Sequence, residues 1–88
     1  MKHIDTEQLK TASFIAGHQE LYEMLTHGKM DPHGRLKWQI DSDTAVAREN
    51  AKKFCRRLRS QARQFGLSTT WADQSFNGRR RIQINTPY

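Results

Sequence analysis

Residues 76–85 read FNGRRRIQIN, an Asn-Gly pair followed by three arginines and then by isoleucines that alternate with amide side chains. Asn-Gly is typical of a tight hairpin turn, which needs positive backbone angles. Because successive strand residues point to opposite faces, packing of Ile82 and Ile84 on a core places Arg79 and Arg81 on the other face. This stretch therefore predicts a strand with one apolar face and one basic face.

Two further segments predict strands beside it. Residues 67–73 (LSTTWAD) form the other arm of the hairpin, and residues 35–41 (RLKWQID) alternate strictly between apolar and polar side chains, as a half-buried strand does. By the same alternation Arg80 falls on the apolar side, where its guanidinium group is expected to reach around the edge. The predicted basic face holds Arg35, Lys37, Gln39, Ser68, Thr70, Arg79, Arg81, Gln83 and Asn85.

Two helical regions precede the hairpin. Residues 5–27 begin with an Asp N-cap and are followed by Gly28, which predicts a left-handed C-cap. Their apolar pattern changes phase near Gly17, which indicates either one kinked helix or two shorter ones. Residues 28–34 predict a loop. Residues 42–44 (SDT) supply N-cap candidates for a second helix, which is expected to run to about residue 65 with an apolar face.

The order of these elements is helix, strand, helix, strand, strand. Eighty-eight residues suffice for a single domain spanning 1–88. We therefore expect an α+β two-layer sandwich, a three-stranded sheet with two helices on one face. That arrangement buries Trp38, Trp71, Ile82 and Ile84.

The positive charge is concentrated after the first third of the chain. The formal net charge is +6 and the pI about 10. Residues 1–27 hold two basic and four acidic residues, whereas residues 28–88 hold thirteen basic and five acidic residues. A basic surface of this kind favours an acidic partner, with nucleic acid first, then an anionic membrane or an acidic protein.

The predicted second helix carries a basic stripe. Glu49 is the one acidic residue in its body, so few ion pairs at helical spacing are available. Unpaired like charges cost stability, and the stripe therefore favours a partner as well, at a site that need not coincide with the sheet face. The stripe consists of Arg48, Lys52, Arg56, Arg59 and Arg63.

Other candidate site residues are few. Phe76, in the hairpin turn, either stacks on a base or holds the loop in place. The four histidines lack zinc-type spacing, and the single cysteine, Cys55, indicates core packing and a reducing compartment. No phosphate-binding loop or nucleophile motif is present in the sequence, so neither an enzyme, a cofactor nor a metal is expected. Without a signal-type or membrane-spanning apolar run, a cytoplasmic protein with no membrane partner is predicted.

Residues 62–84 (ARQFGLSTTWADQSFNGRRRIQI) resemble the C-terminal half of an R3H domain. The shared features are a basic helix ending in Gly-Leu, a polar strand, a glycine-containing turn and an arginine-rich start to an isoleucine-rich strand. The element order is also similar to that of the C-terminal domain of translation initiation factor three. The R3H signature, arginine followed four residues later by histidine, is replaced here by Cys55 and Arg59. The resemblance implies binding of single-stranded nucleic acid.

Together these patterns predict a small non-catalytic module that binds DNA or RNA, single-stranded or structured. The alternative is an accessory or inhibitor protein that docks its basic surface on an acidic protein. The residues expected to bind nucleic acid are Arg35, Lys37, Lys52, Arg56, Arg59, Arg63, Phe76, Arg79, Arg81 and Gln83.

Overall fold

The computed structural model describes residues 5–74 and 78–85, which form three helices and four strands. The helices are α1 (Thr6–Ile15), α2 (Gln19–His27) and α3 (Ala45–Arg63), and the strands are β1 (Lys29–Met30), β2 (Leu36–Asp41), β3 (Ser68–Gln74) and β4 (Arg79–Asn85).

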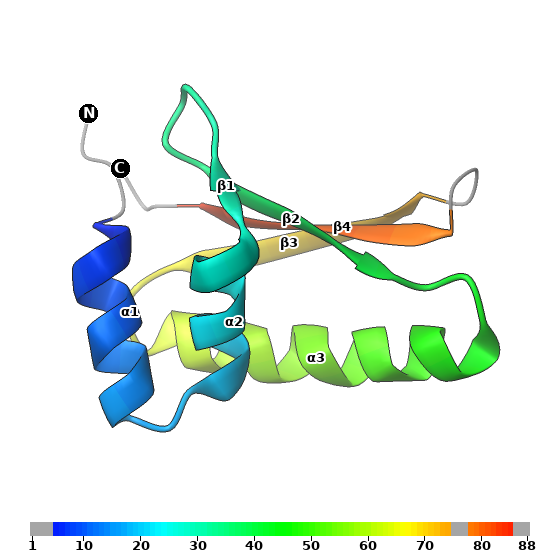
Figure 1. The fold of residues 1–88 in the computed structure, drawn as a ribbon, viewed down its shortest axis with the longest axis horizontal. Helices are drawn as coiled ribbons and strands as arrows, with labels where there is room; N and C mark the ends of the chain where they lie inside the picture. The colour runs from blue at the N-terminus through cyan, green and yellow to red at the C-terminus, as the bar shows by residue number, and fades with distance from the viewer. Residues whose placement is uncertain (1–4, 75–77, 86–88) are drawn as a thin grey trace.

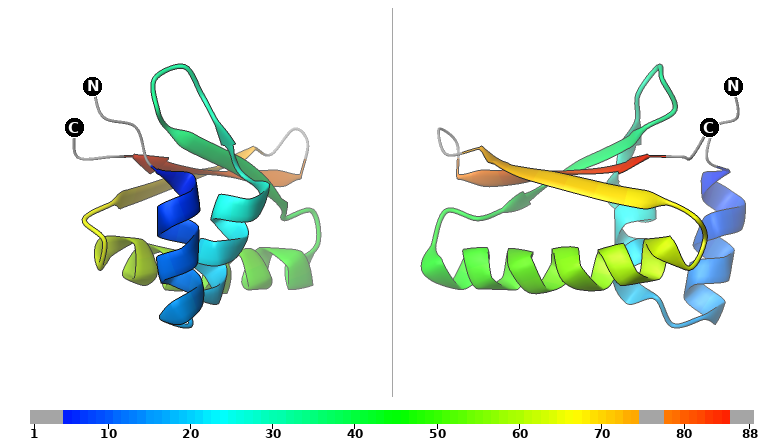
Figure 2. Two further views of the ribbon diagram at one scale, coloured as in Figure 1. Left: turned by 60° about the vertical axis from the view of Figure 1, so that its left-hand side comes forward. Right: turned by 180° about the vertical axis from the view of Figure 1, so that it is seen from behind.

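The four strands form one antiparallel sheet in the order β1-β2-β4-β3, and the helices lie on one side of it (Figures 1 and 2). Strand β4 is central, with β2 and β3 on either side. Its Ile82 lies opposite Trp38 of β2 and Trp71 of β3. The α+β class, the antiparallel pairing of the two predicted hairpin arms and the single helix-covered face are confirmed.

The expected three-stranded sheet is wrong, because Lys29 and Met30 add a short strand within the predicted loop. Lys29 lies opposite Lys37, and Met30 lies opposite Leu36. Two residues are too few to show an alternating pattern, so periodicity does not reveal this strand.

The expected left-handed cap at Gly28 is also wrong, since this residue is extended, with φ −70° and ψ 157°. The chain passes directly from α2 into β1. A Cβ atom at Gly28 would lie 2.6 Å from the carbonyl oxygen of Met24 and 3.0 Å from a side-chain carbon of Leu36. Glycine is therefore required for close approach rather than for a positive φ.

The first helical region divides into two helices, one of the two outcomes expected from its change of phase. Gly17 adopts φ 73° between them, and the N-cap at Asp5 accepts a hydrogen bond from the N–H of Gln8 at 3.2 Å. Helix α1 packs on α2, whereas α2 and α3 pack on the sheet (Figure 2).

Helix α3 begins after Thr44, whose hydroxyl oxygen accepts a hydrogen bond from the N–H of Ala47 at 3.0 Å. It ends at Arg63, two residues earlier than expected, and Gly66 then takes φ 74°. The helix buries one face, formed by Ala51, Cys55, Leu58 and Ala62.

The centre of the core is aliphatic. Trp38 and Trp71, which the sequence places in the core, are half-buried and pack against its margins. The reason is the position of each ring in the sheet: Trp71 lies on the edge strand β3, and Trp38 lies on β2 just beyond the end of its pairing with β1, so both rings lie near an edge of the sheet. Among the described residues, those with at most 1% exposure are Ser13, Leu21, Met24, Leu36, Cys55, Leu58, Ala62, Ile82 and Ile84.

Candidate nucleic-acid interface

The three arginines of β4 divide between two faces, as the alternation predicts. Arg79 and Arg81 are exposed, whereas Arg80 is only 5% exposed and lies on the helix side between Ile40 and Asp73 of the neighbouring strands. Arg80 is thus buried rather than extended around the edge into solvent. The local arginine triplet therefore presents two guanidinium groups to the open side of the sheet.

The register brings the polar residues of three strands into rows on that side. Lys37, Gln83 and Thr70 form one row of cross-strand neighbours. Gln39 lies opposite Arg81 in the next. We call this surface the open face and define it by Lys29, Lys37, Gln39, Thr70, Arg79, Arg81 and Gln83.

Lys29 is a member of the open face that sequence reasoning missed. Its backbone lies opposite that of Lys37, and cross-strand partners share a face of the sheet. By this register the two residues belong to the same end of the open face. The sequence of residues 28–34 is typical of a loop, and a loop pattern does not indicate which face of a sheet a residue occupies.

Two of the predicted residues, Arg35 and Lys37, are engaged by Asp31 in the β1–β2 loop. The Nε of Arg35 lies 3.0 Å from Asp31 Oδ2, and the Nζ of Lys37 lies 3.3 Å from the same oxygen. The backbone N–H of Arg35 donates to Asp31 Oδ1 at 2.9 Å. That backbone bond is the main reason why the pKa of Asp31 lies well below its usual range, and the side chain of Lys37 acts in the same direction.

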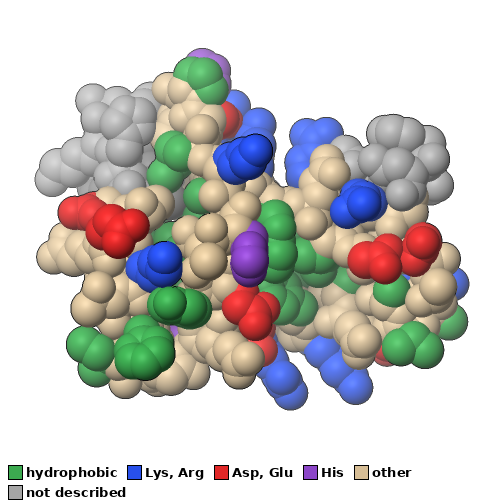
Figure 3. Space-filling model, in the orientation of Figure 1, with side chains coloured by type: hydrophobic (Ala, Val, Ile, Leu, Met, Phe, Trp, Pro, Cys, Tyr) green, Lys and Arg blue, Asp and Glu red, His purple; other side chains and the backbone are tan. Residues whose placement is uncertain are grey.

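The basic residues of α3 form a second region on the other layer of the molecule. Their spacing aligns Arg48, Lys52, Arg56, Arg59 and Arg63 along one side of the helix, which we call the α3 flank. The guanidinium carbon of Arg59 lies 4.3 Å from the ring centroid of Trp71, so the α3 flank runs beside β3. Figure 3 shows Lys and Arg side chains at the top, over the sheet, and at the bottom, along α3, so that basic side chains lie on both layers.

The opposite side of α3 faces α2 and carries mixed charge. The amide of Gln61 donates to Glu20 at 2.8 Å, and Arg57 Nη1 lies 3.7 Å from the other oxygen of Glu20. The structure therefore does not bring the α3 flank and the open face together into one surface.

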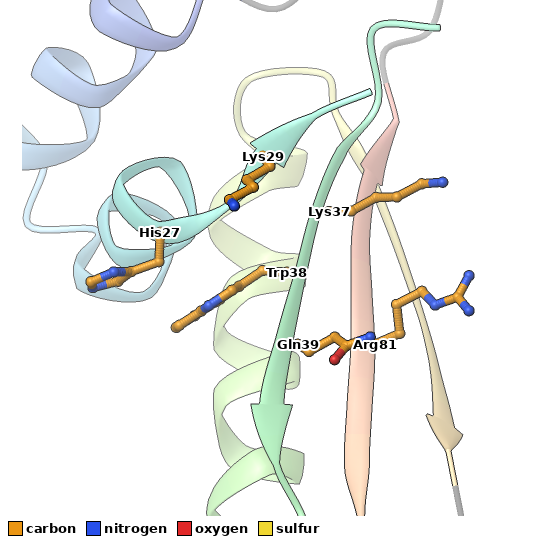
Figure 4. A pocket seen from close by; sticks show the side chains of 6 residues that line it. All are labelled: His27, Lys29, Lys37, Trp38, Gln39 and Arg81. Atoms are coloured by element: carbon orange, nitrogen blue, oxygen red, sulfur yellow. The ribbon is translucent and has the colours of Figure 1, made fainter. Parts of the chain in front are cut away.

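An open cavity of about 490 Å³ lies at the edge of β2, where its pairing with β1 ends (Figure 4). His27 and Trp38 form a stacked ring pair there, with centroids 5.2 Å apart and an interplanar angle of 20°. The lining residues are His27, Lys29, Lys37, Trp38, Gln39 and Arg81.

Phe76, the aromatic candidate of the hairpin turn, lies outside the described residues. Within residues 5–74 and 78–85, no three His, Cys, Asp or Glu side chains come close enough together to hold a metal ion. None of the helices in this part of the chain combines the length and apolar character of a membrane span.

A scan against protein-family models and searches of curated proteins and solved structures found no significant match to this chain. The resemblance to R3H domains therefore stays a prediction.

Proposed function

We propose that this chain is a small, non-catalytic nucleic-acid-binding module whose open face contacts the phosphate backbone. The observation that carries the proposal is the register of the sheet, which gathers Lys29, Lys37, Arg79 and Arg81 on the face that no helix covers.

The composition of the open face supports this function. Arg and Lys alternate there with amide and hydroxyl groups, which donate to phosphate oxygens and contact base edges. Arg79 and Arg81 are two residues apart on β4, so their backbones are about 6.6 Å apart along the strand. Two described carboxylates accompany these cations: Asp41, opposite Arg79 at the end of β2, and Asp31 of the β1–β2 loop, 3.3 Å from Lys37 Nζ. A polar face that served solubility alone would not need this bias towards positive charge.

The α3 flank offers a second contact to the same polyanion. Arg56 and Arg63 are exposed on it, and Arg59 lies against Trp71. Because α3 lies on the other layer, a bound strand would have to pass around β3 to reach both regions. We therefore assign the open face the primary contact.

The test is the salt dependence of affinity for a fluorescent oligonucleotide. Each arginine that neutralises a phosphate releases roughly one counterion, so the Arg79→Ala/Arg81→Ala variant should flatten the plot of log affinity against log salt by about 1.5. Affinity should fall for every nucleic-acid sequence tested, with an unchanged fold, because both side chains are exposed.

Arg57→Ala is the matched control, since it removes one exposed arginine from the α2-facing side of α3. It should leave the slope nearly unchanged. Arg56→Ala/Arg63→Ala should flatten the slope less than the pair on β4 does. A loss for Arg57→Ala that is half of the loss for the β4 pair would mean that net charge, and not the open face, determines binding, because the pair removes two charges and Arg57→Ala removes one.

The alternative, docking on an acidic protein, predicts a different result in a pull-down. Partners captured from lysate should be lost after nuclease treatment if the open face binds nucleic acid. Protein partners that persist after nuclease treatment, and that Arg79→Ala/Arg81→Ala abolishes, would overturn the proposal in favour of the alternative.

A further inference from the structure

We propose that the stacked rings of His27 and Trp38 bind an unpaired nucleobase, so that the module selects single strands. This inference rests on the proposed function, and it assigns a base-binding site at the edge of β2 that lies beside the phosphate-binding open face.

The ring pair has one fixed member and one accessible member. Trp38 contacts Phe54 of α3 edge to face, with centroids 5.6 Å apart and planes at 69°, and it packs against the core. His27 lies nearly parallel on Trp38 and is exposed. The exposed ring of His27, which stacks on a ring packed against the core, offers a flat surface to a base. Every base has a π-face, whatever its identity.

The backbone holds this platform in place. A Cβ atom at position 28 would lie 2.6 Å from the carbonyl oxygen of Met24 and 3.0 Å from a side-chain carbon of Leu36. The glycine therefore allows the end of α2 to approach β2 closely. Pairing of β1 with β2 ends at Lys37, so the imidazole of His27, and not a longer β1, lies beside Trp38. His27 can stack on Trp38 because β1 does not extend alongside Trp38.

Cationic side chains surround the cavity beside the rings. Figure 4 shows His27 and Trp38 on one side of β2, and Lys37, Gln39 and Arg81 on the other. A nucleotide that crosses this edge can stack its base on His27 while its phosphates reach Lys29 and Lys37. The carboxylate of Asp31 engages Lys37 at 3.3 Å, which leaves the exposed Lys29 as the stronger phosphate contact.

The size and chemistry of the cavity fit this occupant. About 490 Å³ lies within the range of small-ligand sites, roughly 300–1,000 Å³. A base inside a duplex exposes only its edges in the grooves, whereas an unpaired base exposes the face that stacks on an aromatic side chain. The ring pair therefore favours single strands over duplexes.

The experiment compares two ligands with equal charge, a short fluorescent oligothymidylate and an abasic oligonucleotide of the same length, by anisotropy. Stacking is worth about a fivefold gain in affinity or more per base, so the native chain should prefer oligothymidylate by at least that factor. His27→Ala should remove this preference and leave affinity for the abasic strand unchanged. His27→Phe should retain it.

His33→Ala is the matched control, because His33 is exposed in the β1–β2 loop and does not line the cavity. A second readout uses Trp71→Phe, which leaves Trp38 as the single tryptophan. Its fluorescence should be quenched by oligothymidylate and much less by the abasic strand.

The outcomes separate the two proposals. Equal affinity of the native chain for both strands, with the salt dependence of the Arg79→Ala/Arg81→Ala variant as expected, would overturn the base-binding site and retain the phosphate-binding face. Equal losses on both strands for His27→Ala would show that His27 acts as a charge or a structural residue. Binding to neither strand would overturn both proposals.

Discussion

The open face and the α3 flank are both rich in Lys and Arg, yet the fold uses them differently. On the open face, which no helix covers, Arg81 and Lys29 are exposed and Lys37 pairs with Asp31 of the neighbouring loop. On the α3 flank, the guanidinium carbon of Arg59 lies 4.3 Å from the ring centroid of Trp71. The Nζ of Lys52 lies 3.4 Å from Glu49 Oε1. The α3 flank thus contributes to packing as well as to charge.

This difference shows that a count of basic residues does not identify a binding surface. The guanidinium group of Arg59 covers a half-buried tryptophan, and its aliphatic stem adds apolar contact. The adjacent Arg80 and Arg81 show the same principle within one strand, since the first is buried and the second is exposed. Position relative to the layers decides what each cation does.

The largest expected effect comes from breaking the core that the two regions share. Leu58 of α3 is completely buried in the cluster that contains Ile82 and Ile84 of β4. Leu58→Ala should lower the free energy of unfolding by about 2–5 kcal/mol, measured by urea denaturation. The thiol of Cys55, buried on the same helix face, should react faster with a thiol reagent in this variant.

Val46→Ala is the control for that change, because Val46 is on α3 but 72% exposed. Its effect on the free energy of unfolding should stay within about 0.5 kcal/mol. A small effect of Leu58→Ala would contradict the shared core and imply that α3 and the sheet are stable independently.

A smaller effect on stability is expected from breaking the contact between Arg59 of the α3 flank and Trp71. Trp71→Ala should cost about 2 kcal/mol, less than for a fully buried tryptophan, because the ring is half-buried. A double-mutant cycle with Arg59→Ala should give a coupling energy of about 0.5–1 kcal/mol, as expected for a cation over an indole ring. A coupling energy of zero would mean that Arg59 does not stabilise the fold through Trp71, and that its role is confined to binding.

The smallest effect concerns the open face and Asp31. Asp31→Asn removes the carboxylate that engages Lys37, and affinity for an oligonucleotide should rise about two- to threefold, the range of an exposed ion pair. Asp41→Asn is a comparison variant at the other end of β2, opposite Arg79. Weaker binding by Asp31→Asn would mean that the carboxylate positions Lys37 rather than competing for it.

The lowered pKa of Asp31 determines how its contribution to stability depends on pH. The pKa of Asp31 is lower in the folded chain than its unfolded value of about 3.9, so its contribution to stability is present above that value and lost as pH falls through the folded pKa. The amide resonance of Arg35 should therefore change little from neutral pH to about pH 4 and shift only at lower pH.

Local patterns in the sequence were sufficient for the class of fold and for the faces of its long strands. Alternation over residues 79–85 correctly separated Arg79 and Arg81 from Ile82 and Ile84, because side-chain direction in a strand depends only on parity. The N-cap at Asp5 was likewise readable, since it rests on a contact within a few residues, and Thr44 is the one of the three N-cap candidates at residues 42–44 that caps α3.

Tertiary structure alone decided the edge of the sheet and the partners of its cations. The pairing of Lys29 with Lys37, the stacking of His27 on Trp38 and the contact of Arg59 with Trp71 join residues from different elements. Strand β1 is too short to show a period, and no local pattern indicates which cation covers a ring. The sequence therefore determined which residues are basic and which way the long strands face, whereas the packing of α2 and α3 against the sheet determined which of those charges point to solvent, because burial depends on neighbours distant along the chain.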